Sequence, residues 1–135
     1  RAVMGPGGKA YVMPGEANAH ILVIDTTNDS VSTLGSGLDK SYANGVLAPN
    51  GKIYSIPEKA NDILEVDVIN QTVTTLFSGD SNISATSLKY GGGVLADNGK
   101  IYAIPYKADR VLEIDPQANG SFNSNVPLSP VFNKY

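Results

Sequence analysis

The sequence predicts an all-β fold made of β-propeller blades, and three observations support this prediction. A motif of thirteen residues is written three times, as AVMGPGGKAYVMP from Ala2, GVLAPNGKIYSIP from Gly45 and GVLADNGKIYAIP from Gly93. Its lysines are 43 and 48 residues apart, a spacing typical of four-stranded propeller blades. The 14 glycines and 8 prolines punctuate short strands, and no segment of useful length has the 3.6-residue apolar period of a helix.

Four columns of identical residues recur in all three copies and fix the alignment of the repeats. The columns hold glycine (Gly8, Gly51, Gly99), tyrosine (Tyr11, Tyr54, Tyr102), proline (Pro14, Pro57, Pro105) and aspartate (Asp25, Asp67, Asp115). We therefore interpret 1–135 as a single propeller segment with repeats 2–34, 45–77 and 93–124. Residues 125–135 form a tail or the start of a further blade.

Each repeat is predicted to contain four short strands, and the middle copy shows the pattern best. The first strand, Gly45 to Ala48, ends at Pro49-Asn50-Gly51, where asparagine and glycine supply the positive φ angles of a tight hairpin. The second strand, Lys52 to Ile56, ends at a proline, because proline has no N–H group to continue the ladder.

The second half of the repeat begins after a short polar loop. The third strand, Ile63 to Val66, is followed by a turn at Asp67. The fourth strand, Thr72 to Leu76, alternates threonine with apolar residues and fits an outer strand with one hydrated face. Its copy in repeat 1 is Ser30 to Leu34, whereas 119–123 in repeat 3 lacks the alternation.

Three blades do not close a ring, because propellers close with about 4 to 8 blades. The open blade faces and strand edges that remain favour association. We therefore expect either a longer polypeptide or several copies that complete the ring together. The expected partners are a protein, or further blades of the same propeller, with a homo-oligomer as one possible form.

Composition excludes several classes of partner. Ten basic and 13 acidic residues leave no basic stripe for nucleic acid, and the longest apolar run, Ile21 to Ile24, is far shorter than the ~20 residues of a membrane-spanning helix. The chain has no cysteine, which rules out disulfides and thiolate sites within it. About two glycosylation sequons are expected by chance. The chain has four, which favours a secreted or lumenal location only slightly: Asn28, Asn70, Asn82 and Asn119.

The strings ILVIDTTNDSVSTL (Ile21 to Leu34) and ILEVDVINQTVTTL (Ile63 to Leu76) resemble the repeats of YVTN-type and NHL-like β-propellers. In those repeats a strand ending in Ile-Asp precedes an Asn-containing turn and a Thr/Val-rich strand. The resemblance covers nearly the whole chain, although KIYSIP and KIYAIP stand where the YVTN family has its Tyr-Val-Thr-Asn run. It implies propeller blades but no single function, because this group includes surface-layer proteins, interaction platforms and enzymes.

A binding surface is predicted on one face of the ring. Because the strands alternate in direction, the loops after the second and fourth strands emerge on one face and the tight turns on the other. The first group of loops varies between repeats, and variation on a regular scaffold is typical of binding surfaces. We expect Tyr42 and Tyr106 to be exposed there. The predicted contact residues are Glu16, His20, Tyr42, Glu58, Lys59, Asp62, Tyr106, Lys107 and Arg110.

No catalytic residue, metal site or cofactor is predicted within the chain. His20 is the only histidine, so a multi-histidine metal site within the chain is impossible, and the sequence pattern identifies no Ser-His-Asp or Cys-His set. In a closed ring the repeated aspartates could hold Ca²⁺. We prefer the interpretation that each aspartate accepts backbone N–H groups of its own turn.

The repeated tyrosines and lysines also have structural interpretations. We expect the tyrosines to pack in the core, with their hydroxyls bonded between blades, rather than to stack on sugars. Lys9, Lys52 and Lys100 are expected to pack their aliphatic stems and keep their ammonium groups in water. The alternatives are that they pair with an acid of a neighbouring blade or line the ring. Glu65 and Glu113 stand where repeat 1 has Val23, so their role is not required of every blade.

Three functional hypotheses remain. The first is a non-enzymatic propeller module that acts as a protein-interaction scaffold or as a binding subunit of a larger assembly. The second is a lectin-like or other small-ligand-binding propeller, which would need equivalent pockets between blades. The third is a fragment of an NHL-like or lactonase-like enzyme whose catalytic groups lie outside this chain.

Overall fold

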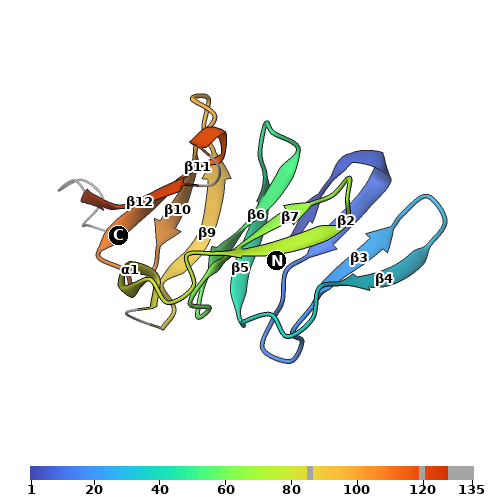
Figure 1. Cartoon of the computed structure of the whole chain (residues 1–135), viewed down its shortest axis with the longest axis horizontal. Coiled ribbons are helices and arrows are strands. Elements are labelled where there is room, and N and C mark those ends of the chain that lie inside the picture. The colour runs from blue at the N-terminus through green and yellow to red at the C-terminus, as the bar shows by residue number, and fades with distance from the viewer. Residues whose placement is uncertain (85–86, 119–120, 128–135) are drawn as a thin grey trace.

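The computed structural model describes residues 1–84, 87–118 and 121–127. Within them, three four-stranded antiparallel sheets lie side by side in chain order (Figure 1). Each sheet keeps its four strands in sequence order, so each is one hairpin-connected unit. We call these sheets blades 1, 2 and 3. The predicted all-β class and the four-stranded repeat unit are confirmed.

The blades have strands of three to seven residues. Blade 1 consists of β1 (Ala2–Met4), β2 (Lys9–Val12), β3 (Ile21–Asp25) and β4 (Ser30–Leu34). Blade 2 consists of β5 (Tyr42–Leu47), β6 (Lys52–Pro57), β7 (Ile63–Asp67) and β8 (Thr72–Leu76). Blade 3 consists of β9 (Tyr90–Leu95), β10 (Ile101–Pro105), β11 (Arg110–Asp115) and β12 (Ser121–Pro127).

Short helical turns occupy three of the connections. They are η1 (Pro6–Gly8), α1 (Ser81–Ser84) and η2 (Pro116–Ala118). None of the helices in the described ranges is long and apolar enough to cross a membrane.

Three strands have other boundaries in the structure than the sequence predicts. The first strands of blades 2 and 3 begin three residues early, at Tyr42 and Tyr90, each opposite the proline that ends the second strand. A register shift separates these tyrosines from the rest of the ladder, which is why they fall outside the aligned motif. The fourth strand of blade 3 runs later than 119–123, as Ser121–Pro127, and residues 119–120 lie outside the described ranges.

The hairpin prediction is confirmed at the turns between first and second strands. Gly51 and Gly99 both have a φ angle of 81°, a backbone conformation that residues other than glycine rarely adopt. Asn50 and Asn98 accept the backbone N–H two residues later, at 2.9 and 3.0 Å. The Asn-Gly pair therefore shapes each turn through one hydrogen bond and one permissive backbone position.

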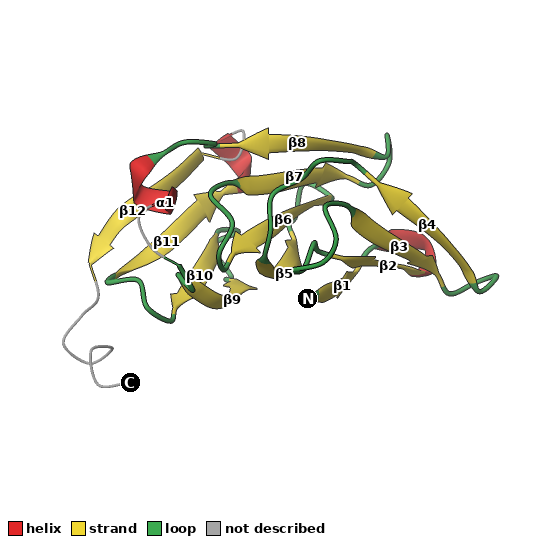
Figure 2. Ribbon diagram, turned by 90° about the horizontal axis from the view of Figure 1, so that it is seen from below, coloured by secondary structure: helices red, strands yellow, loops and turns green. Residues whose placement is uncertain are grey.

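Antiparallel pairing separates the connections into two ends of the molecule. We call the end with the second-to-third-strand loops and the inter-blade connections the loop face. It comprises residues 13–20, 35–41, 58–62, 77–84, 87–89 and 106–109. The tight turns that follow the first and third strands of each blade lie at the other end, which we call the turn face. In Figure 2 the first strands β1, β5 and β9 lie together along one side of the blades, and β8 lies along the opposite side.

The hydrophobic core lies between the blades. Alternating residues of each strand face the blade before or the blade after, so blade 2 contributes to both core clusters. We call the side of a blade that faces the next blade its exit face, and the opposite side its entry face. The exit face of blade 1 comprises Tyr11, Met13 and Ile21. The exit face of blade 2 comprises Tyr54, Ile56 and Ile63. The entry face of blade 2 includes Ile53, Leu64 and Val66. The entry face of blade 3 includes Ile101, Leu112 and Ile114.

Two glycines in first strands let neighbouring blades approach closely. A Cβ atom on Gly45 would lie 2.9 Å from Val3 of blade 1 and 3.3 Å from Met13. A Cβ atom on Gly93 would lie 2.6 Å from the end of the Ile56 side chain of blade 2. At both junctions, apolar side chains of one blade therefore pack against the backbone of a glycine in the first strand of the next.

Candidate binding face

The loop face is held by hydrogen bonds between each inter-blade connection and the loops beside it. The carbonyl of Ser41, the last residue of the first connection, accepts N–H groups from Glu58, Lys59 and Ala60 at 3.1, 3.0 and 3.1 Å. Three donors on one carbonyl fix the start of the loop after β6.

The second connection repeats this arrangement one blade later. The carbonyl of Lys89 accepts the N–H groups of Tyr106 and Ala108 at 2.8 and 3.2 Å. The N–H of Lys89 donates to the Glu58 carbonyl at 2.7 Å and so ties the loops of blades 2 and 3 together. The backbone framework is therefore common to both connections.

Arg1 and Glu58 join blades 1 and 2 across this framework. The Arg1 guanidinium donates to Ser41 Oγ at 2.7 Å, to the Tyr42 carbonyl at 2.5 Å and to the Glu58 carboxylate at 3.2 Å. The buried Ser41 hydroxyl donates to the same carboxylate at 2.7 Å. Glu58 was predicted as a contact residue, but its carboxylate is bound by Arg1 and Ser41 and holds the loops together.

A second ion pair joins two exposed loops. The Lys59 ammonium group donates to the Glu16 carboxylate. This hydrogen bond and the charge of Lys59 lower the pKa of Glu16 below its ordinary value. Both side chains keep a large exposed surface, so water competes with the pair and a ligand group can replace either partner.

Tyr42 and Asp62 form a pair beneath these loops. The Tyr42 hydroxyl donates to the Asp62 carboxylate, and the two side chains are 0% and 7% exposed. Burial raises the pKa of Asp62, while the hydrogen bond from Tyr42 opposes part of that rise. The expectation that Tyr42 is exposed is wrong, because its ring packs in the core between blades 1 and 2. Asp62 is likewise covered rather than presented to solvent.

Lys89 is a second buried ionisable group of the loop face. Its side chain is 1% exposed, and its ammonium group donates to the Lys59 carbonyl at 3.2 Å. Burial lowers the pKa of Lys89, and the charge of Asp39 opposes this. The same Asp39 charge raises the pKa of Asp62 and of Tyr42. The partly exposed Asp39 therefore acts electrostatically on three buried residues, Tyr42, Asp62 and Lys89, which we call the buried ionisable group.

The remaining predicted contact residues are presented on the surface or close to it. Tyr106 is 70% exposed, which agrees with the expectation for it. Lys107 is exposed on the same loop, and Arg110 is exposed at the start of β11, 3.7 Å from the carboxylate of Asp109. His20 is partly buried. Their role in binding stays a prediction.

The sequence analysis missed four residues of this face: Arg1, Asp39, Ser41 and Lys89. A signal existed for Ser41 and Lys89, because each directly precedes the tyrosine that begins a first strand. That position lies outside the repeated motif, so the repetition within the motif does not reveal it. Arg1 and Asp39 have no counterpart that repetition could reveal.

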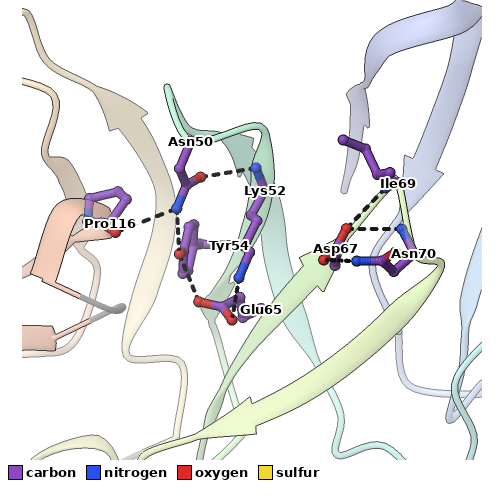
Figure 3. Close-up of polar contacts among 8 residues, drawn as sticks. All are labelled: Asn50, Lys52, Tyr54, Glu65, Asp67, Ile69, Asn70 and Pro116. Atoms are coloured by element: carbon purple, nitrogen blue, oxygen red, sulfur yellow. Dashed lines mark hydrogen bonds and ion pairs between the residues drawn. The ribbon is translucent and has the colours of Figure 1, made fainter.

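On the turn face, the repeated aspartates cap their own turns, as predicted. Asp67 accepts the N–H groups of Ile69 and Asn70, both at 3.0 Å (Figure 3). Asp25 accepts the N–H of Thr27 at 2.9 Å, and Asp115 accepts that of Gln117 at 3.0 Å. Among the described residues, no group of three histidine, cysteine, aspartate or glutamate side chains could hold a metal ion.

The lysine prediction needs correction at two of its three positions. Lys52 pairs with Glu65 at 3.3 Å, and Lys100 pairs with Glu113 at 2.9 Å, each within its own blade. Antiparallel register explains this, because Lys52 stands opposite Asp67 in the ladder and Glu65 lies two residues earlier on the same face. The ammonium groups are therefore neither simply hydrated nor paired with a neighbouring blade.

The repeated tyrosines pack between blades at the covered junctions, as predicted, but the expectation that their hydroxyls bond between blades is met by Tyr11 and not by Tyr54, whose hydroxyl bonds within blade 2. Tyr11 and Tyr54 are 1% and 0% exposed. The hydroxyl of Tyr54 donates to Glu65 at 2.7 Å, and that of Tyr11 accepts from Gln71 of blade 2 at 3.1 Å. Neither ring offers a face on which a sugar could stack.

No protein-family model matches the sequence, and no curated protein matches it. Solved structures do match. Virginiamycin B lyase from Staphylococcus aureus superposes with a TM-score of 0.71 at 12% identity, over 96% of this chain and 41% of the lyase chain. The luciferin-regenerating enzyme gives 0.61 at 13% identity, over 96% and 44%. The extracellular domain of a one-component system from B. thetaiotaomicron gives 0.66 at 14% identity, over 98% and 18%.

These neighbours correct the hypothesis that excluded an enzyme. Two of them are named as enzymes, so blades of this shape belong to enzymes as well as to an extracellular domain. The chain spans about two fifths of the length of the lyases, so it corresponds to part of such a structure. At these identities the likeness establishes the fold alone: this chain consists of β-propeller blades, as the resemblance to NHL-like repeats implied.

Proposed function

We propose that the chain supplies three consecutive blades of a β-propeller and that its loop face binds a protein partner within a larger assembly. The observation that carries this proposal is the contrast between framework and surface on that face. The backbone bonds to the Ser41 and Lys89 carbonyls repeat from one connection to the next. The side chains at equivalent loop positions vary between blades: one position holds Gly15, Glu58 and Tyr106, and the next holds Glu16 in blade 1 but lysine in blades 2 and 3, as Lys59 and Lys107.

A repeated framework with unlike outward side chains is how a regular scaffold acquires a specific surface. Blade 3 offers the clearest contact, because Tyr106 is 70% exposed beside Lys107 and Arg110. Tyrosine and arginine are enriched where protein interfaces carry most of their binding energy. An exposed aromatic ring with two neighbouring cations suits a partner surface that is acidic around an apolar centre.

The experiment is site-specific photo-crosslinking in an extract of the natural source. Tyr106→p-benzoylphenylalanine places the crosslinker on the loop face, and Ile69→p-benzoylphenylalanine places it on the turn face as a control, since Ile69 is 85% exposed. We expect a protein that crosslinks only from position 106. Purified, it should bind the unmodified chain with a Kd at least about tenfold lower than it binds Tyr106→Ala. Identical products from both positions, or equal affinity, would contradict the proposal.

Lys59→Ala gives a second test on the neighbouring blade. Its ion pair with Glu16 is exposed, so the variant should keep the melting temperature of the unmodified chain. Binding of the crosslinked partner should weaken if its contacts extend from blade 3 to blade 2. Unchanged affinity would restrict the interface to the blade 3 loop.

A section of a propeller enzyme is the second candidate, and the buried ionisable group favours it. Asp62 with a raised pKa and Lys89 with a lowered pKa are shifted in the directions typical of acid–base residues. Further catalytic groups would come from blades outside this chain. The intact mass of the natural polypeptide tests this first. If it contains more blades and shows turnover, Asp62→Asn should lower kcat by at least about a hundredfold. Unchanged kcat would exclude Asp62 from catalysis.

A further inference from the structure

Both blade junctions are closed on the turn face by the same kind of polar bridge. At the junction of blades 2 and 3, the Asn50 side-chain amide donates to the Tyr54 hydroxyl at 3.0 Å and to the Pro116 carbonyl at 3.4 Å (Figure 3). Asn50 and Tyr54 belong to blade 2, and Pro116 belongs to blade 3. One amide thus links the exit-face tyrosine of a blade to a turn carbonyl of the next.

The junction of blades 1 and 2 contains the equivalent bridge. The Gln71 amide donates to the Tyr11 hydroxyl at 3.1 Å and to the Val68 carbonyl at 2.6 Å. Val68 and Pro116 occupy the same position, directly after the aspartate that ends the third strand. We call this arrangement of tyrosine hydroxyl, amide and turn carbonyl the amide bridge. The amide comes from the later blade at one junction and from the earlier blade at the other.

Blade 3 carries the first half of a further amide bridge. Its Asn98 amide donates to the Tyr102 hydroxyl at 3.0 Å, as Asn50 does to Tyr54 one blade earlier. The apolar part of the exit face is repeated as well, because Ile104 is the counterpart of Ile56. Ile56 is 0% exposed beneath blade 3, whereas Ile104 is 39% exposed. Blade 3 is therefore shaped to be covered in the way that blades 1 and 2 are covered.

Blade 1 carries the matching entry face. Its cross-strand pairs Ala10–Ile24 and Val12–Leu22 lie opposite the face that packs on blade 2. In blade 2 the corresponding residues are the pair Ile53–Val66 and the residues Ser55 and Leu64, which share a hydrogen bond. In blade 3 they are the pairs Ile101–Ile114 and Ala103–Leu112. Thr26 stands directly after the aspartate that ends β3, where blades 2 and 3 have the bridging carbonyls. A single chain therefore carries both halves of one more junction.

We propose that the exit face of blade 3 binds the entry face of blade 1 in a second copy, so that two copies close one ring. In each junction between copies, the Asn98 amide donates to the carbonyl of the partner's Thr26, and Ile104 packs against the partner's β1. Two copies with three blades each supply six blades, within the range of about 4 to 8 at which propellers close. This surface is separate from the loop face, so the proposal extends beyond the binding of a protein partner.

One difference between blade 1 and the other blades sharpens the proposal. Ala2 stands where Gly45 and Gly93 receive an apolar side chain of the preceding blade. The methyl group of the partner's Ala2 would therefore meet Ile104. The end of a flexible side chain can turn aside, so the contact forms at some cost. Ala2→Gly should remove that cost and strengthen the association, which a role of Ala2 in its own blade alone would not predict.

The experiment is sedimentation velocity over a concentration series, with native mass spectrometry on the same samples. The unmodified chain should show a reversible species with twice the chain mass of 14.2 kDa. Ile104→Asn should raise the dissociation constant about a hundredfold, because a factor of about ten applies at each of two junctions. Ile69→Asn, on an exposed turn of blade 2, should leave it unchanged.

Two further variants keep the result interpretable. Asn98→Asp retains the oxygen that accepts the Lys100 N–H but removes the amide donor, so it should weaken association about tenfold. Ala2→Gly should strengthen the reversible association of two copies about threefold. Circular dichroism confirms the fold of each variant.

Three results would overturn the proposal. The first is a folded chain that stays monomeric over the whole series. The second is a set of species larger than two copies, since a contact that does not close makes open chains. The third is an association that Ile104→Asn and Ile69→Asn affect equally. None of these results bears on the loop face, which the crosslinking experiment tests separately.

Discussion

The covered exit faces of blades 1 and 2 and the open exit face of blade 3 have nearly the same residues and different environments. Tyr54 and Ile56 are fully buried beneath blade 3. Their counterparts Tyr102 and Ile104 are partly exposed and 39% exposed. The sequence of a blade therefore determines which side chains point toward the next blade, and the next blade determines whether they are buried.

The largest expected effect comes from truncating the matched isoleucines in dilute, monomeric protein. Ile56→Ala should lower the free energy of unfolding by about 2–5 kcal/mol, because it leaves a cavity in the core between blades 2 and 3. Ile104→Ala should cost less than about 1 kcal/mol, since its side chain already contacts water. Chemical denaturation measures both. Equal losses would mean that the blade 3 face is covered in the monomer.

The strain caused by replacing a turn glycine should be the same beside a covered exit face and beside the open one. Gly51 and Gly99 share φ of 81° with open space around them, although one lies beside a covered junction and the other does not. Gly51→Val and Gly99→Val should each lower stability by about 1–3 kcal/mol through local strain. Gly15→Val is the control, because Gly15 has open space but no positive φ. An unchanged melting temperature for Gly51→Val would refute the turn assignment.

Removing the amide of Asn50 or of Asn98 should have a smaller effect on stability, and the effect should differ between the two residues. Asn50→Asp keeps the turn bond to the Lys52 N–H but removes the donor to Tyr54 and Pro116, so it should cost about 1–2 kcal/mol in thermal unfolding. Asn98→Asp should cost less in the monomer, where the bridge has only its tyrosine half. A larger loss for Asn98→Asp would reverse the proposed roles of the two residues.

The smallest effects concern a buried and an exposed aspartate, whose pKa shifts have opposite signs. Folding raises the pKa of Asp62, so its contribution to stability is present at low pH and is lost as the pH rises through the folded-state pKa. Folding lowers the pKa of Asp67 through its bonds from Asn70, so that contribution is present at neutral pH and is lost on acidification.

Melting curves of two variants against pH measure these contributions. Relative to the unmodified chain, the melting temperature of Asp62→Asn should rise as the pH increases from acid to neutral. That of Asp67→Asn should fall over the same range. Parallel curves for both variants would show that burial of Asp62 does not control its titration.

Much of the fold could be predicted because its determinants are local. Asn-Gly at the hairpin, proline at the strand end and aspartate after the third strand act within a few residues of themselves. The strand starts at Tyr42 and Tyr90 escaped prediction because they pair with a proline across a register shift. The pairing of Lys52 with Glu65 was missed because it required the register between β6 and β7.

The candidate site was harder to predict, because exposure depends on contacts between blades. Tyrosine is a residue type common in surface contacts, but Tyr42 is covered by blade 1 and its hydroxyl donates to Asp62. Tyr106 keeps its exposure because its loop lies at the outer surface of blade 3. Arg1 reaches Glu58 over a separation of 57 residues, and no local pattern indicates such a contact.

The position of the cores between blades also sets how stability grows as repeats are duplicated. A new blade added to an open row brings one complete interface, so a duplicated repeat contributes to the core as soon as it is translated and folded. A row always has one interface fewer than it has blades, and a ring has as many interfaces as blades. Closure therefore yields an additional core without a single added residue, which gives selection a reason to favour complete rings over longer rows.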